Sequence, residues 1–278
     1  MNSRRMASAK WVGATARILR RVYGSKSPAT LFTEKARQIL RETKVSGPPF
    51  DPFEYAHKLG ITVQEKEDMV IDGLLQRNDQ CEFVVHLKKN APKYRKNFTL
   101  AHEISHTFFY DLLTHPMSFR SNSSFDPEEE RLCDLAAAEL LMPCSVFKRD
   151  LLKNSDITPK TLLELSNLYE ISLQAVAIRA VGVIQNLACS IWKLQGPAID
   201  LHWITPSKLN RLTLCQTGKS SVEQAIDQPG EEFTCLDSFY GGRASGRMMG
   251  KTASFRLRSG QVLSVITLPK NQSECLRR

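Results

Sequence analysis

Two histidines stand four residues apart in the stretch FTLAHEISHTFFYDLL, residues 98–113, and a glutamate directly follows the first of them. Positions four apart on an α-helix differ by about 40° around its axis, so His102 and His106 would project from one face and reach one ion. Glu103 would lie about 100° away, beside that ion, where it could take a proton from water. Alone, the stretch is also compatible with an ordinary amphipathic helix that carries two histidines.

A catalytic metal site of this kind needs a third protein ligand. The three-histidine arrangement of the metzincins requires a histidine six residues after His106, but that position is Leu112, and the metzincin glycine position is Phe109. The sequence therefore excludes that class. It favours a gluzincin-like arrangement, in which a glutamate from a second helix completes the site.

The stretch EEERLCDLAAAELL, residues 128–141, predicts this second helix, with acidic residues in the first turn as the helix dipole favours. Glu130 and Asp134 are about one turn apart and border the apolar stripe of the helix. We assign Glu130 as the third ligand and Asp134 as the acceptor that orients a ligand histidine through its other N–H. The other acids of this helix are interpreted as structural: Glu128, Glu129 and Glu139.

Two histidines, one carboxylate and an open position for water form the pattern of a catalytic rather than a structural zinc site. We therefore expect one Zn²⁺ per chain, with Mn²⁺ as a substitute that the same ligands accept. Tyr110 and His115 are candidates for stabilising a transition state. Core packing is the simpler role for Tyr110.

These residues resemble a known family. RKNFTLAHEISHTFF and EEERLCDLAAAELLMP are similar to the two signature blocks of the ImmA/IrrE-type metallopeptidases. Arg95, Phe98 and Thr99 precede the two histidines at the spacing of that family, and a Leu–Met–Pro sequence closes the second block. The resemblance covers roughly residues 30–195.

The resemblance implies an α+β fold: a gluzincin-like metallopeptidase domain with a small sheet packed on the active-site helices. By carry-over, His102, His106 and Glu130 would be the ligands and Glu103 the general base. It also implies a protein substrate, typically a helix-turn-helix repressor that is cleaved under stress or when mobile elements are induced. No small-molecule cofactor is expected.

Elsewhere the chain shows weaker periodic patterns. Helices are predicted over residues 29–45 and 53–60, and strands over 61–66 and 82–89 around a turn-prone IDG. A helical pair over 158–181 resembles a helix-turn-helix in its rhythm.

After Trp192 apolar and polar residues alternate, which predicts strands, including a hairpin that turns at Ser259–Gly260. We therefore expect a peptidase domain over residues 28–195, which includes the helical pair. A small, mainly β region of unknown role would then occupy residues 196–278.

The net charge of +9 is concentrated near the N-terminus. Residues 1–27 have no acidic residue and are interpreted as a solvated, flexible basic arm. Because the rest of the chain is close to neutral, direct nucleic-acid binding is not expected. The basic residues of this arm are Arg4, Arg5, Lys10, Arg17, Arg20, Arg21 and Lys26.

The 278 residues contain seven cysteines, an odd number, and none forms a close C-x-x-C pair. Scattered thiols fit a reducing cytoplasm better than a disulfide framework. No apolar run is long enough to span a membrane, so we expect a cytoplasmic protein without a membrane partner.

Site-specific zinc endopeptidase is the function that the sequence favours, and two alternatives stay open. A DNA-binding regulator would use the helical pair and the basic arm. However, the second helix of the pair offers only Gln174 and Arg179 as readers, and LQAVAI is too apolar to lie in a groove. A catalytically silent peptidase fold could act as a protein-binding module, although every expected metal residue is present.

Overall fold

The chain has an α+β fold with a small sheet and a larger one, which agrees with the predicted fold class at that level. The computed structural model separates into two compact units. The first unit comprises residues 1–146 and 168–172, and the second comprises 147–167 and 173–278. The structure describes residues 11–24, 26–45, 47–112, 127–153, 156–195, 198–205, 213–214, 220–241 and 246–269.

The first unit combines helices with a three-stranded sheet. Its helices are α1 (Ala14–Tyr23), α2 (Pro28–Thr43), α3 (Pro52–Lys58), α4 (Lys93–His106), α5 (Phe108–Leu112) and α6 (Pro127–Leu141). Its strands are β1 (Thr62–Lys66), β2 (Gly73–Arg77) and β3 (Phe83–Lys88).

Local sequence signals start two of these helices. The Ser27 side chain caps α2 by accepting from the Thr30 N–H at 3.1 Å, and Pro28 occupies the first helical position. Asp51 caps α3 in the same way, accepting from the Phe53 N–H at 2.9 Å. Proline is tolerated at these positions because a first-turn N–H has no partner within the helix.

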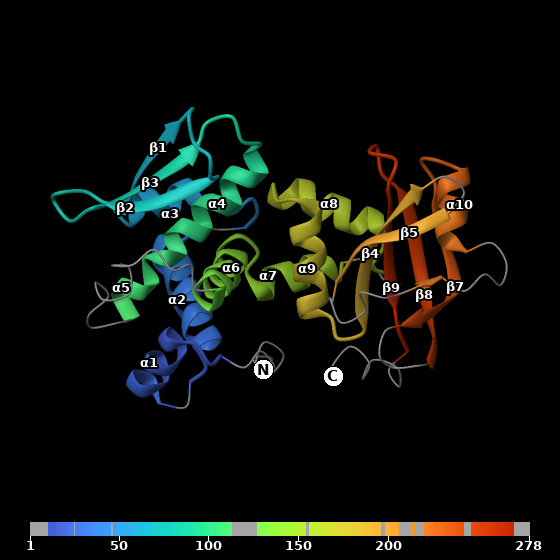
Figure 1. Ribbon diagram of the computed structural model, residues 1–278, viewed down its shortest axis with the longest axis horizontal. Helices are drawn as coiled ribbons and strands as arrows, with labels where there is room; N and C mark the ends of the chain where they lie inside the picture. Colours follow the sequence, from blue (N-terminus) through green and yellow to red (C-terminus); the bar gives the residue numbers. More distant parts are fainter. Residues whose placement is uncertain are drawn as a thin grey trace. The chain divides into compact units, whose positions relative to one another are not determined.

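Helix α4 lies at the centre of the first unit, between the small sheet and α6 (Figure 1). Helix α2 packs against α6, and its Phe32 ring lies 5.7 Å from Phe108 and 4.7 Å from Phe109, centroid to centroid. Leu100 and Ile104 of α4 are fully buried in this core. Burial of these apolar faces fixes α4 against its neighbours.

The small sheet has the strand order β1-β3-β2, with β1 parallel and β2 antiparallel to β3. The sequence predicts β1 and β3, the first and third strands along the chain, but it does not predict β2. Strand β2 is short and begins with Gly73, a residue that weakens strand propensity. Both β2 and β3 pack on α4, so β2 is an edge strand that lies against the central helix.

The central helix differs from its predicted form at both ends. It begins at Lys93 rather than near Thr99. The sequence does not reveal this earlier start, because the first two turns are polar and carry no apolar periodicity. It ends at His106, and α5 starts separately after Thr107. The Thr107 hydroxyl donates to the Ile104 carbonyl at 2.7 Å and closes the helix there.

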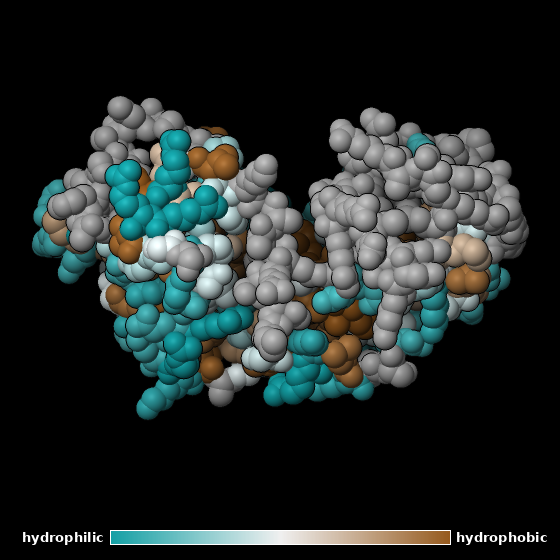
Figure 2. All heavy atoms as spheres, turned by 90° about the horizontal axis from the view of Figure 1, so that it is seen from below, coloured by the Kyte–Doolittle hydropathy of each residue, from teal (hydrophilic) through white to brown (hydrophobic). Residues whose placement is uncertain are grey.

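The N-terminal segment is also different from the flexible arm that its charge suggests. Residues 14–23 form helix α1, which follows a buried Trp11 and buries Ala16 and Leu19. The basic residues Arg17, Arg20 and Arg21 stay exposed. The face of the first unit seen from below is mostly hydrophilic, with single hydrophobic residues between the polar ones (Figure 2).

The second unit is built on a sheet with the order β5-β4-β9-β8-β7-β6, antiparallel throughout. Its strands are β4 (Leu187–Gln195), β5 (Ala198–Thr205), β6 (Thr213–Leu214), β7 (Glu232–Gly241), β8 (Gly246–Arg256) and β9 (Val262–Thr267). The remaining helices of the chain are α7 (Cys144–Leu151), α8 (Pro159–Tyr169), α9 (Leu173–Val183) and α10 (Ser221–Asp227). The predicted hairpin is confirmed as β8–β9, with Gly260 at a φ of +82°.

The predicted boundary at residues 195/196 falls between β4 and β5, which pair with each other. Helix α9 and most of α8 belong to the same compact unit as the large sheet. Helix α9 packs on β4 and β5, and Ala188 and Trp192 of β4 share a core with Val222 of α10 and Ile266 of β9. Within the described residues, no helix is both long and apolar enough to cross a membrane.

We predict that Gly73→Ala loosens the contact between β2 and α4. A Cβ atom at residue 73 would lie 2.3 Å from the Thr99 Cγ2 atom, so one of the two elements must shift. We expect a loss of about 1–3 kcal/mol, the usual size for overpacking. Amide hydrogen exchange of β2 and α4 measures it, with Gly182→Ala as the control because that site has open space. Unchanged exchange in Gly73→Ala would contradict the close contact.

Candidate metal centre

The central helix presents both histidines of the motif to the same region. His102 and His106 lie in the last turns of α4, with ring centroids 4.9 Å apart and ring planes at 73°. Both imidazoles are largely buried, and the exposed fractions of their side chains are 15% and 9%. The structure thus places the two histidines on one face of the helix, as their spacing predicts.

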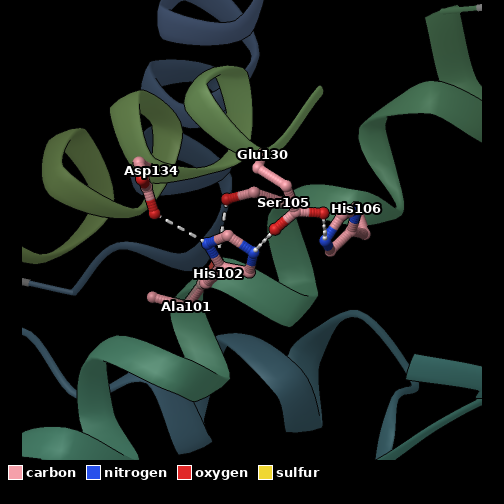
Figure 3. A network of polar contacts seen from close by, with 6 residues as sticks. All are labelled: Ala101, His102, Ser105, His106, Glu130 and Asp134. Atoms are coloured by element: carbon pink, nitrogen blue, oxygen red, sulfur yellow. Dashed lines mark hydrogen bonds and ion pairs between the residues drawn. The ribbon is translucent and has the colours of Figure 1, made fainter. Parts of the chain in front are cut away.

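Glu130, in the first turn of α6, brings its carboxylate between the two imidazoles (Figure 3). Its Oε2 atom lies 3.0 Å from His102 Nε2, and its Oε1 atom lies 3.5 Å from His106 Nε2. Two nitrogens and one carboxylate, all proposed as ligands from the sequence, therefore converge on one point. This donor set suits a divalent ion such as zinc.

Asp134 holds the other nitrogen of the first imidazole. Its Oδ1 atom lies 2.9 Å from His102 Nδ1 (Figure 3). Because Asp134 follows Glu130 by one helical turn, α6 supplies both partners of the same ring. An acceptor at Nδ1 leaves Nε2 as the nitrogen that can bind a metal.

These contacts change the acidity of the histidine. Burial lowers the pKa of His102, but the hydrogen bonds to Asp134 and Glu130 and the nearby charge of Glu103 raise it to about 9. The raised pKa favours the form of His102 in which both ring nitrogens are protonated and donate to the two carboxylates. A metal that binds Nε2 must displace one of these protons.

Glu103 lies on the side of α4 that faces the small sheet. Its side chain is 9% exposed, and a Cβ built at Gly73 would be 3.2 Å from its Oε1 atom. The glycine therefore lets the backbone of β2 approach the carboxylate closely. Glu103 is thus next to the histidines in the sequence and adjacent to the edge strand in space.

The two candidate transition-state stabilisers have different outcomes. The Tyr110 ring packs edge-on against Phe83 of β3 at 5.0 Å, with the Arg77 guanidinium 5.3 Å from its centroid. The break at Thr107 removes the simple eight-residue relation to His102 on which the sequence argument relied. These contacts favour the packing role for Tyr110. His115 lies outside the described residues.

The acids interpreted as structural hold specific partners. The Glu128 carboxylate accepts from the N–H groups of Val12 and Gly13, the two residues that precede α1, each at 2.8 Å. Glu129 accepts from the Thr15 hydroxyl. Helix α1 is therefore attached to the turn of α6 that carries Glu130. Trp11, Thr15 and Leu19 recur every four residues, and this helical spacing is the signal that could have revealed α1 in the sequence.

Two further residues of α6, Glu139 and Cys133, are buried. Glu139 is 3% exposed and forms an ion pair with Arg37 of α2 at 2.7 Å. This contact ties α6 to α2 and gives Glu139 a structural role. Cys133 is fully buried, and its sulfur lies near His102 and His106, a proximity that the sequence reasoning missed.

Comparison with known proteins identifies the class. Residues 56–181 match the IrrE N-terminal-like domain, which defines a family of peptidases. The chain is 31% identical over 176 residues to the radiation response metalloprotease IrrE of Deinococcus deserti, a match that covers 59% of this chain. Both matches support a relationship of residues 56–181 to the ImmA/IrrE-type metallopeptidase family. The chain spans 60% of the length of that curated relative.

A likeness to a solved structure concerns the fold alone. A Mycobacterium tuberculosis transcriptional regulator superposes with a TM-score of 0.52 and is 12% identical in sequence. The match covers 88% of this chain and 90% of that one.

We predict that zinc binding at neutral pH releases a proton from His102, and that Asp134→Asn reduces this release. Loss of the carboxylate removes the strongest factor that raises the pKa of His102, so the imidazole is already less protonated before zinc binds. Titration calorimetry in buffers of different ionisation enthalpy counts the protons. Below pH 9, the affinity of the wild-type protein for zinc should rise with pH, because fewer protons then compete with the metal for His102. Equal proton release in both proteins would contradict the pKa assignment.

Proposed function

We propose that this protein is a zinc-dependent, site-specific endopeptidase that cleaves a regulatory protein, a helix-turn-helix repressor. The observation that carries the proposal is the convergence of His102, His106 and Glu130 on one point, with Glu103 beside them. The match of residues 56–181 to the IrrE N-terminal-like domain supports metal-dependent peptidase chemistry. The Deinococcus deserti relative is named a radiation response metalloprotease, which supports a role in stress.

The donor set fits a catalytic zinc ion. His102 and His106 would supply nitrogens, Glu130 an oxygen, and Asp134 would fix the His102 ring through Nδ1. Three protein ligands leave a position for water and substrate. Mn²⁺ is a substitute that the same nitrogen and oxygen donors accept.

When bound, the ion supplies Lewis-acid chemistry, which polarises a peptide carbonyl and acidifies water. Glu103 then takes the proton from the attacking water and later gives it to the leaving peptide nitrogen. Its burial against β2 holds the carboxylate in one position while both transfers occur. Asp134 keeps the His102 ring in the tautomer that presents Nε2.

Edge strand β2 offers a place for an extended substrate. Among the described strands, β2 pairs only with β3, so its other edge can accept the backbone of an added peptide. Val70 and Ile71, which precede this strand, are 99% and 52% exposed and can contact apolar side chains. An extended peptide on this edge would run next to Glu103, which supports a protein rather than a small-molecule substrate.

The DNA-binding alternative is weaker in the structure than in the sequence. Arg179, the one cation that α9 offers for DNA contact, is only 7% exposed. Ile178 on the same helix is 51% exposed, and an apolar residue does not bind phosphates. No described feature of α9 therefore favours DNA recognition.

We predict that Glu103→Gln retains one metal ion per chain but cleaves the repressor at least about 100-fold more slowly, the usual contribution of a general base. Purified proteins are incubated with any small helix-turn-helix repressor that is encoded beside this protein, and the fragments are followed by mass spectrometry. Glu164→Gln, an exposed residue of α8, is the matched control and should cleave normally. Undiminished cleavage by Glu103→Gln would refute the mechanism, and intact repressor with the wild-type protein would refute the proposed substrate.

A further inference from the structure

Cys133 stands at the centre of the α6 face that forms the metal centre. It follows Glu130 by three residues and directly precedes Asp134. Residues three apart on a helix lie on the same side, so the thiol and the Glu130 carboxylate project in similar directions. The Cys133 side chain is fully buried between α6 and its neighbours.

The thiol lies within reach of both imidazoles. The sulfur of Cys133 and one ring nitrogen each of His102 and His106 all lie within 4.8 Å of one another. Donor atoms around a tetrahedral zinc ion are roughly 3.4–3.6 Å apart, given zinc–nitrogen and zinc–sulfur bonds of about 2.0–2.3 Å. Movements of about 1 Å would therefore bring the three atoms to ligand distances.

Core packing alone does not require sulfur at this position. The neighbouring core positions of α6 are Leu132, Ala136 and Ala137, all fully buried and apolar. An alanine or another small residue would fill the same space, whereas a thiol adds a donor that binds zinc strongly once deprotonated. Its position beside two imidazoles is therefore chemically informative.

We propose that Cys133 is a further protein ligand beside His102 and His106, which closes the coordination of the metal in a resting state and gives way to water in the open state that the proposed function requires. The inference rests on the proposed metal site and deepens it. Four protein ligands make a closed, resting centre, while three make an open, catalytic one. A thiolate also favours zinc over manganese, because soft sulfur ligands suit zinc and oxygen ligands suit manganese.

Cobalt substitution tests this proposal directly. A thiolate bound to Co²⁺ gives a strong sulfur-to-metal charge-transfer absorption in the near ultraviolet, which imidazole and carboxylate ligands do not give. We expect this band in the Co²⁺-loaded wild-type protein and its loss in Cys133→Ala. Cys189→Ala, which changes an equally buried cysteine of the second unit, should keep the band.

The affinity for two metals provides a second readout. In Cys133→Ala, the zinc affinity should fall by about tenfold or more, because even the loss of a group that only orients a ligand typically costs about 10–100-fold. The manganese affinity should change much less. Equal losses for both metals, or identical cobalt spectra in the wild-type and Cys133→Ala proteins, would overturn the inference.

The outcomes separate this inference from the proposed function. A cobalt-loaded wild-type protein without the charge-transfer band, whose zinc form still cleaves the repressor, overturns only the role of Cys133. A protein that binds no cobalt overturns the metal site itself, and with it both proposals. The band in the wild-type protein and its loss in Cys133→Ala support the thiolate ligand whether or not the repressor is the substrate.

Discussion

The packing of α4 against α6 is the interaction on which the rest of the centre depends. It brings Glu130, a residue 24 positions after His106 in the chain, to within 3.5 Å of both imidazoles. No single helix could supply this geometry, since the two histidines already fill one face of α4. The contact is held by buried apolar residues such as Leu100, Ile104 and Leu132. The polar centre therefore relies on an ordinary hydrophobic interface.

Neighbouring elements refine this two-helix frame. Helix α1 binds the first turn of α6 through Glu128, and α2 binds the other end through Arg37 and Glu139. On the opposite side of α4, Gly73 allows β2 to approach Glu103. The Glu128 contacts lie in the helical turn that carries Glu130, and Gly73 lies against Glu103, so both contacts favour a preorganised arrangement of these polar groups. Such preorganisation is what metal binding and proton transfer require.

Helical periodicity was sufficient to predict which polar residues come together. His102 and His106 are four residues apart, as are Glu130 and Asp134. This spacing places each pair on one face of its helix, independently of tertiary contacts. Features that depend on tertiary contacts were missed. The polar start of α4 and the glycine-led strand β2 have weak local signals and are stabilised by their neighbours. Helix α1 has an amphipathic pattern, but its basic charge favoured the interpretation as a flexible arm. Cys133 was overlooked for a similar reason, because its proximity to the imidazoles exists only in the fold.

We propose that Glu130, carried by α6, completes a metal site on α4. Metal content, measured by elemental mass spectrometry after gel filtration of Glu130→Gln and Glu129→Gln proteins, tests it most directly. The two variants change adjacent carboxylates of one helix, but only Glu130 contacts the imidazoles. We predict one zinc ion per chain in Glu129→Gln and a large loss of zinc in Glu130→Gln. Full zinc occupancy in Glu130→Gln would contradict it.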